Sequence, residues 1–235
     1  MIEILNWNTA LTENHKNYKS IFSCIEDFLN KENAIVVLQQ IPIKDPNDKW
    51  KPHKLFLNLQ NRIQKHLGCR IFVNDEYNSG FVYMGTVIIT NIKDIEQVAD
   101  NYYPKNKKTN RECAISVKLA SKELVILGLH AENGEKNKNY LESISGDADV
   151  ILGDFNAGDY EESENRDLFK EILKEHVCIC NMPTKRVMSK GLLIRKTCID
   201  HVFVRRKNVT ACFDMKVHED NELSDHYPIS FKINM

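Results

Sequence analysis

The sequence predicts an α+β protein in which two stacked, mostly antiparallel β-sheets are flanked by helices. Short apolar runs rich in β-branched and aromatic residues recur along the 235 residues and outnumber the amphipathic helical stretches. Glycine and proline are few and scattered, and the sequence contains no internal repeat, low-complexity tract or linker. We therefore expect one domain over residues 1–235, with stacked sheets inside and helices outside.

The first third of the chain alternates between strand and helix patterns. Residues 2–7 form an apolar run of strand length, and residues 34–38 form a second one. Residues 18–31 place apolar side chains at helical spacing, which predicts a helix with one buried stripe. Residues 55–67 repeat this spacing and stop at Gly68, a typical helix end.

The rest of the chain is richer in strand patterns. Apolar, β-rich runs predict strands at residues 70–73, 80–91, 114–119, 124–129, 149–152, 199–204 and 229–233. The runs 114–119 and 124–129 lie close enough to form a hairpin that turns at residues 120–123. One further helix is expected around Leu168–Leu173, where the apolar residues return to helical spacing.

Composition excludes several classes of protein. The 32 Lys+Arg residues balance the 33 Asp+Glu residues, so any contact with nucleic acid must be local and not a basic coat. No apolar run reaches the roughly 20 residues of a membrane span, and the start of the sequence shows no signal peptide. Seven cysteines without a C-x-x-C pair favour reduced thiols over a disulfide framework or zinc knuckle. We expect a cytoplasmic protein without a membrane partner or an obligate protein partner.

Polar residues gather where predicted strands begin or end. They are Asn8, Gln39, Gln40, His130, Asp154, Asn156, Asp200, His201, Asp225 and His226. Any one of them is most simply a cap or turn residue, but so many together favour a functional site.

These residue types suit metal-assisted hydrolysis. The carboxylates of Asp154, Asp200 and Asp225 offer hard oxygen ligands, which suit Mg²⁺, Mn²⁺ or Ca²⁺ better than zinc. The histidines titrate near neutral pH and can act as acids or bases. The chain has neither a G-x-S-x-G elbow nor a P-loop. Attack of water on a phosphoester fits this set best.

Seven segments of the sequence also resemble motifs of a known protein family. In chain order they read LNWNT (5–9), VVLQQIP (36–42), TNRECAISVKL (109–119), VILGLHAENG (125–134), DVILGDFNAG (149–158), TCIDHVFV (197–204) and LSDHYPISF (223–231). The chain resembles the endonuclease/exonuclease/phosphatase superfamily, and within it the deoxyribonuclease I-like sandwich. This resemblance implies a divalent-metal-dependent phosphodiesterase, most simply a nuclease that hydrolyses DNA.

The resemblance implies roles for particular residues. Asn8, Gln40 and Asp225 would hold the metal, with Asp154 beside the metal and the attacking water. Catalysis would use His130, Asp154, Asn156, Asp200 and His226, with Asp200 orienting His226. Substrate contacts would come from Arg111, Asn156 and Thr197.

One departure concerns the metal site. The superfamily motif usually reads L-Q-E, and its glutamate is the main metal carboxylate, whereas this chain has Leu38-Gln39-Gln40. A neutral Gln40 should weaken Mg²⁺ binding. Three alternatives stay open: an active enzyme with a weaker metal site, a catalytically impaired nucleic-acid-binding protein, or a glutamine introduced in place of glutamate to trap substrate.

The substrate also stays open at this stage. The superfamily includes enzymes for DNA, RNA, lipids and small phosphoesters, so the fold alone does not choose. The segment around Arg111 favours DNA, because the resemblance makes it a contact to the phosphate backbone. Two basic stretches could flank a groove, formed by Lys105, Lys107, Lys108 and Arg111 and by Lys185, Arg186, Lys190, Arg195 and Lys196.

Overall fold

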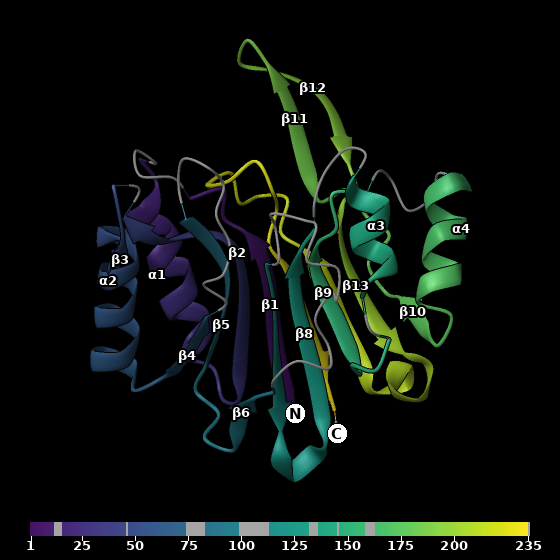
Figure 1. Ribbon diagram of the computed structural model, residues 1–235, viewed down its shortest axis with the longest axis horizontal. Coiled ribbons are helices and arrows are strands. Elements are labelled where there is room, and N and C mark those ends of the chain that lie inside the picture. The colour runs from purple at the N-terminus through teal and green to yellow at the C-terminus, as the bar shows by residue number, and fades with distance from the viewer. Residues whose placement is uncertain are drawn as a thin grey trace.

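The computed structural model describes residues 1–11, 16–45, 47–73, 83–98, 113–131, 136–144, 146–157 and 163–234. Two β-sheets stack face to face, and helices cover both outer faces (Figure 1). The predicted arrangement of stacked, mostly antiparallel sheets flanked by helices is therefore confirmed. Within the described ranges, no helix is long and apolar enough to cross a membrane.

The larger sheet has seven strands and contains both ends of the chain. Its order is β14 (Cys212–Val217), β15 (Ile229–Ile233), β1 (Ile2–Asn8), β2 (Ala34–Asp45), β5 (Tyr83–Thr90) and β4 (Arg70–Val73), with β3 (Asp48–Pro52) paired to β2. Only β1 and β2 pair in parallel among these strands. Because β1 lies between β15 and β2, the N-terminal strand is central in the sheet.

The second sheet has six strands. Its order is β10 (His176–Cys178), β13 (Asp200–Arg205), β9 (Val150–Asp154), β8 (Leu124–His130), β7 (Cys113–Leu119) and β6 (Ile95–Gln97). The predicted hairpin is β7 and β8, joined by a short 3₁₀ turn. A separate two-stranded ribbon, β11 (Lys185–Ser189) and β12 (Leu192–Thr197), stands above both sheets in Figure 1.

The helices divide between the two outer faces. The helices α1 (Tyr18–Leu29) and α2 (Lys54–Gln60) cover the seven-stranded sheet, whereas α3 (Lys136–Glu142) and α4 (Ser163–Ile172) cover the six-stranded sheet (Figure 1). The predicted helix 55–67 is not uniform, because α2 passes at Asn61–His66 into a π-helical segment. A 3₁₀ segment at Arg206–Ala211 precedes β14.

Several short elements were not predicted from the sequence. They are β3, β6, β10, β11, β12, β14 and α3. Each of the strands has at most six residues, and most of their side chains lie at least partly in solvent. Such strands do not need the apolar alternation that identifies a buried strand.

The layer between the sheets positions the polar residues. Alternate residues of a strand share one face, so each central strand points one set of side chains into this layer. Most of that set is apolar and buried, as Ile4, Ile126, Leu152 and Val202 are. On the same faces, at one end of the strands, the set continues with Asn8, His130, Asp154 and Asp200. The core therefore brings polar groups from four strands together at the upper edge in Figure 1.

Candidate functional site

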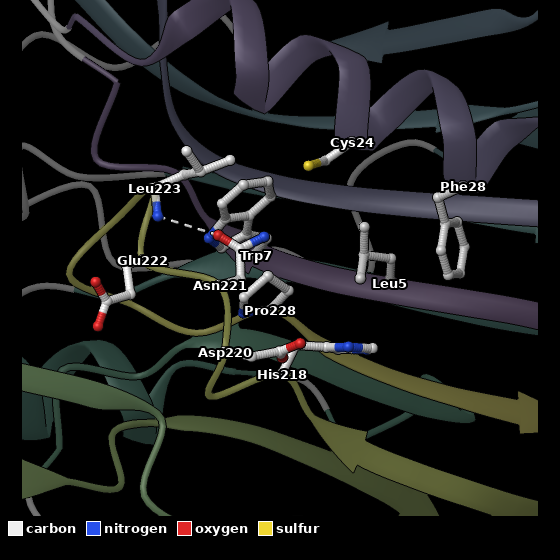
Figure 2. A pocket seen from close by; sticks show the side chains of 10 residues that line it. All are labelled: Leu5, Trp7, Cys24, Phe28, His218, Asp220, Asn221, Glu222, Leu223 and Pro228. Atoms are coloured by element: carbon white, nitrogen blue, oxygen red, sulfur yellow. Dashed lines mark hydrogen bonds between the residues drawn. The ribbon is translucent and has the colours of Figure 1, made fainter.

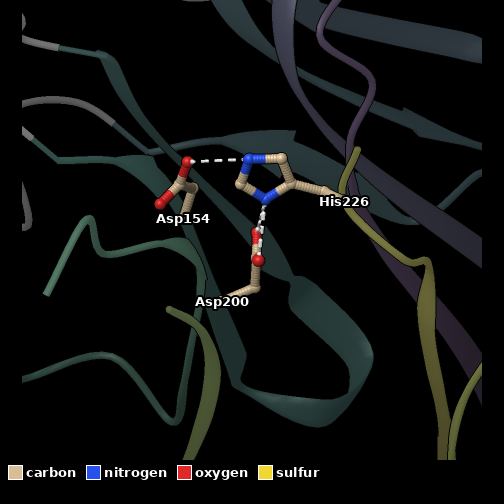
Figure 3. A group of neighbouring side chains, drawn as sticks. All are labelled: Asp154, Asp200 and His226. Carbon is tan, nitrogen blue, oxygen red and sulfur yellow. Dashed lines mark hydrogen bonds and ion pairs between the residues drawn. The ribbon is translucent and has the colours of Figure 1, made fainter. Parts of the chain in front are cut away.

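A buried imidazole lies between two carboxylates at this edge. His226 precedes β15, and its Nδ1 is 2.8 Å from Asp200 Oδ2, while its Nε2 is 3.8 Å from Asp154 Oδ2 (Figure 3). All three side chains are buried. Burial works against the charged imidazolium, but the negative charges of Asp200 and Asp154 outweigh it and raise the pKa of His226. The ring is therefore oriented and its protonated form is favoured.

Asp154 is the point at which the other predicted residues meet. Its Oδ2 accepts a hydrogen bond of 2.8 Å from the Asn8 amide and lies 3.6 Å from His130 Nε2. Its Oδ1 accepts a hydrogen bond of 2.8 Å from the backbone amide of Asn156. Gly153, with a φ of 147°, allows the close approach to β8, because a Cβ there would lie 1.9 Å from the Leu129 carbonyl oxygen. The position of this carboxylate is thus fixed from both sides.

Asp200 is held by a residue that sequence reasoning missed. The hydroxyl of Thr184 donates a hydrogen bond of 2.8 Å to Asp200 Oδ2, and it accepts bonds from the amides of Ile199 and Asp200. Thr184 is fully buried. No motif in the sequence pointed to it, because it lies outside the seven recognised segments.

Two further residues that sequence reasoning missed support the backbone of the site. The indole Nε1 of Trp7 donates a hydrogen bond of 3.0 Å to the carbonyl oxygen of His226. The hydroxyl of Ser224 donates one of 2.9 Å to the carbonyl oxygen of Asn8. Trp7 and Ser224 belong to the segments LNWNT and LSDHYPISF, which were the available signal for them. These contacts join the end of β1 to the loop that carries His226.

Gln40 lies in a bulge of β2, next to the end of β1. Gln39 pairs with Asn8, so Gln40 follows at the same edge of the sheet. The register of β2 against β5 shifts between Leu38 and Ile41, and Gln40 has a φ of 58°. A left-handed conformation costs a non-glycine residue roughly 1–2 kcal/mol. Bulges of this kind redirect a side chain and occur often beside active sites.

The remaining predicted residues differ in their surroundings. Asp225 is partly exposed, and its Oδ2 lies 3.4 Å from Lys185 Nζ. Asn156 directs its side-chain amide to the carbonyl oxygen of Ala131 at 2.8 Å. Thr197 ends β12, and its carbonyl oxygen accepts the amide of Thr184.

The predicted substrate surface also includes two basic stretches. Arg111 and the basic stretch with Lys105, Lys107 and Lys108 lie outside the described residues. The second basic stretch lies on the ribbon of β11 and β12.

The donor set fits a hard divalent cation. Ligand atoms of Asp154, Asp200 and His226 lie within 4.8 Å of one another. Two buried carboxylates in one cluster leave negative charge that needs a cation nearby. Carboxylate oxygens are the ligands that Mg²⁺ and Mn²⁺ prefer. Asp200 is already occupied by His226 and Thr184, so its oxygens are less open to an ion than those of Asp154.

A separate cavity of about 500 Å³ lies on the α1 side of β1 (Figure 2). Its lining combines apolar side chains of β1 and α1 with the polar loop before His226, and consists of Leu5, Trp7, Cys24, Phe28, His218, Asp220, Asn221, Glu222, Leu223 and Pro228. None of these described residues belongs to the cluster of Asp154, Asp200 and His226. Trp7 contacts both regions, because its indole reaches the His226 backbone.

Comparison with known proteins identifies the fold. No protein-family model and no curated protein matches the chain. Among solved structures, the 3′-5′ exonuclease NExo from Neisseria meningitidis is 16% identical with a TM-score of 0.70, over 100% of both chains. An endonuclease/exonuclease/phosphatase family protein from Leptotrichia buccalis is 16% identical with a TM-score of 0.71, also over 100% of both chains.

A retrotransposon enzyme is similar over the same length. The endonuclease domain of TRAS1, a telomere-specific non-LTR retrotransposon, is 16% identical with a TM-score of 0.65, over 100% of this chain and 99% of that one. The sheet order, the layers and these neighbours agree with the resemblance seen in the sequence. The chain therefore has the fold of the endonuclease/exonuclease/phosphatase superfamily.

Proposed function

We propose that the chain is a divalent-metal-dependent phosphodiesterase that hydrolyses nucleic acid, with DNA as the substrate. One observation carries this proposal: Asn8, Asp154, Asp200 and His226 come from distant parts of the chain and meet in one buried hydrogen-bonded cluster. A cluster of two carboxylates and an imidazole is costly to bury. Hydrolysis of a phosphodiester uses all of these groups.

Structural neighbours support this choice of chemistry. They are an exonuclease, an endonuclease domain and a 3′ phosphatase bound to product DNA hairpin. Each of these proteins acts on, or was seen with, a phosphoester of nucleic acid. The choice of DNA as the substrate rests in addition on the segment around Arg111, which the resemblance makes a contact to the phosphate backbone.

Each residue of the cluster would have its own role in the reaction. Asp200 accepts the Nδ1–H of His226 and so leaves Nε2 facing Asp154 and the space where a phosphate would lie. His226 can then take or give a proton at Nε2. His130, whose Nε2 lies 3.6 Å from the same Asp154 oxygen, would be the second proton carrier. Asn156 would orient the phosphate, and Thr197 and Arg111 would contact it.

The metal would be held by Asn8, Gln40 and Asp225, with Asp154 beside it. A bound Mg²⁺ or Mn²⁺ would supply Lewis-acid stabilisation of the phosphoryl oxygens. Gln40 is the weak member of this set, because its amide oxygen carries no charge. A catalytically impaired nucleic-acid-binding protein is therefore the second candidate function, and the neutral Gln40 is the observation that favours it.

The decisive experiment compares the wild-type protein with Gln40→Glu. Two unit charges about 4 Å apart near a protein surface interact by about 4 kcal/mol. An added carboxylate should therefore tighten Mg²⁺ binding by at least about tenfold, which needs only about 1.4 kcal/mol. Plasmid nicking with Mg²⁺, Mn²⁺ or EDTA, and calorimetric titration of the metal, measure both effects.

A matched control is available in Gln64→Glu. Gln64 is exposed on the outer helical layer, so the same chemical change there should alter neither metal affinity nor cleavage. Equal metal affinity in the wild-type and Gln40→Glu proteins would remove Gln40 from the metal site. Absence of metal-dependent cleavage in both, with DNA still bound, would leave the second candidate function.

The two histidines are tested in whichever protein, wild type or Gln40→Glu, cleaves DNA. There His130→Ala and His226→Ala should each lower turnover by at least about 100-fold, the low end of general acid–base contributions. Near-normal turnover, with unchanged circular dichroism, would exclude that histidine from proton transfer.

A further inference from the structure

A further cavity of about 420 Å³ lies on the outer face of the six-stranded sheet, among α4, β10 and β13. These elements stand at the right of Figure 1. Phe203 of β13 lines the cavity and belongs to the apolar cluster under the outer helices, whereas Val202 beside it faces the layer between the sheets. Asp200 shares the face of Val202, because alternate residues of a strand point the same way. The six-stranded sheet therefore separates this cavity from the candidate site.

One wall of the cavity is apolar and largely aromatic. Phe169 and Leu173 contribute to it from α4 and the residue after its end, and Phe203 contributes from the sheet. The rings of Phe169 and Phe203 are buried, with their centroids 5.1 Å apart. Small-molecule sites have volumes of roughly 300–1,000 Å³, apolar walls and a few polar groups. This wall and this volume suit a ligand with a flat ring system.

The mouth of the cavity is positively charged. Lys174 and Arg206 are exposed there, and neither forms an ion pair with any residue in the described ranges. Arg206 Nε donates a hydrogen bond of 3.1 Å to the carbonyl oxygen of Lys174, which brings the two residues together. Lys170 adds a third cation, 3.7 Å from Asp167. No acidic residue of the described chain lines the cavity, so Lys174 and Arg206 offer positive charge to an anion.

The buried part of the cavity contains an unpartnered acceptor. His176 is 4% exposed, and its Nε2 donates a hydrogen bond of 2.8 Å to the carbonyl oxygen of Ala148. Burial lowers the pKa of His176, so the neutral ring is favoured and Nδ1 is an acceptor. Nδ1 is itself buried and receives no hydrogen bond from the part of the chain that the structure describes. Buried polar atoms are seldom left unpaired, so Nδ1 marks a place for a ligand N–H group.

We propose that this cavity binds a nucleoside monophosphate, with its base against the aromatic wall, an amino group on His176 Nδ1 and its phosphate at Lys174 and Arg206. A phosphate monoester carries a charge of about −1.5 to −2 at neutral pH, which matches these two cations. Arginine and lysine are common phosphate ligands in proteins. The site is separate from the proposed phosphodiesterase centre and does not depend on its activity.

The three parts of the cavity favour this ligand over simpler anions. A fatty acid could place its carboxylate at Lys174 and Arg206, but its tail has no hydrogen to donate to His176 Nδ1. Inorganic phosphate would leave the aromatic wall uncovered. A neutral nucleoside would leave the charge at the mouth unmatched. Only a ligand with a ring, an N–H donor and a phosphate uses all three.

The first test is calorimetric titration of the wild-type protein in EDTA, where metal-dependent turnover is absent. Adenosine monophosphate should bind, and adenosine and inorganic phosphate should each bind at least tenfold more weakly. Purine riboside monophosphate has the same ring and phosphate without the exocyclic amino group. It should bind at least fivefold more weakly than adenosine monophosphate, because His176 Nδ1 then stays unpaired.

The second test changes the protein. The double variant Lys174→Glu with Arg206→Glu should weaken binding of adenosine monophosphate at least tenfold. The matched control is Lys19→Glu with Lys65→Glu, which changes the net charge equally at exposed residues on the opposite outer face and should leave binding unchanged. His176→Phe should abolish the preference for the amino group. If His176→Phe does not fold by circular dichroism, the comparison of the two nucleotides on the wild-type protein still tests Nδ1.

Proton NMR of the histidine rings shows where the nucleotide binds. Saturating adenosine monophosphate should shift the ring signals of His176 and leave those of His226 unchanged, because the sheet lies between them.

Four results would overturn the inference. They are a wild-type protein that does not bind adenosine monophosphate, inorganic phosphate that binds as tightly as the nucleotide, a Lys174→Glu/Arg206→Glu protein that binds within twofold of wild type, and a nucleotide that shifts His226 but not His176. Failure of the proposed function is separate, because DNA cleavage by the wild-type and Gln40→Glu proteins tests the phosphodiesterase alone.

Discussion

Replacing Thr184 with valine tests what holds Asp200 in the cluster of Asp154, Asp200 and His226. Valine has nearly the same shape as threonine but lacks the hydroxyl. The substitution therefore removes the hydrogen bond of 2.8 Å to Asp200 and the acceptor of the Ile199 and Asp200 amides. Because Thr184 is fully buried, water cannot replace these contacts without rearrangement.

The magnitude follows from these contacts. A hydrogen bond to a charged group contributes about 1.5–3 kcal/mol, and each buried amide left without its acceptor costs about 1 kcal/mol or more. Loss of all three hydrogen bonds should lower the free energy of unfolding by about 3–5 kcal/mol. For a chain of this length that lowers the melting temperature by roughly 6–20 °C.

Thr184→Ser separates the hydroxyl from the methyl group. Serine keeps all three hydrogen bonds and loses one buried methyl, so it should cost only about 1 kcal/mol. Urea unfolding of the three proteins, followed by circular dichroism, measures the difference. If the valine and serine variants agree within about 0.5 kcal/mol, the hydroxyl does not hold Asp200 and this account of the cluster is wrong.

Three further predictions concern the fold around the site. Gly153→Ala should lower the free energy of unfolding by about 3 kcal/mol or more, because its Cβ would overlap the Leu129 carbonyl oxygen. Gly68→Ala has open space around the new Cβ and should lower it by only about 1–2 kcal/mol. Thermal unfolding of the two variants measures the difference. Burial lowers the pKa of His176, so the unfolded chain takes up a proton there before the folded protein does as the pH falls through about 6.5, and stability should decline. The decline should be smaller in His176→Gln. An equal slope of melting temperature against pH in the wild-type and His176→Gln proteins would contradict this. Burial raises the pKa of the Cys180 thiol to about 11, so a disulfide reagent should modify it only after unfolding, and prompt labelling of the native protein at pH 8 would contradict its burial.

Much of the cluster could be predicted because strand periodicity is local. Once residues 2–7, 124–129 and 149–152 are identified as strands, their alternation fixes which side chains share a face. Asn8, His130 and Asp154 follow in the same phase as the buried apolar residues before them. The sequence therefore indicates both the polar set and the face on which it lies.

Gln40 shows where this local reasoning ends. Strict alternation would have placed it on the same face as Leu38, against α1 and α2. The bulge in β2 interrupts that alternation, and it depends on how β2 pairs with β5, about 45 residues away in the chain. The sequence showed that Gln40 replaces the expected glutamate, but not its backbone conformation.

The sequence by itself determined the class of fold, the central strands, and a set of polar residues whose types suit phosphoester hydrolysis. These follow from periodicity and residue type over a few neighbouring positions. Only the tertiary structure decided that Asn8 bonds Asp154 across 146 residues, that Thr184 holds Asp200, and that the ribbon of β11 and β12 joins the backbone beside His226. The physical reason is that these contacts depend on how two sheets stack and where a short exposed ribbon joins them, and neither leaves an apolar pattern in the chain.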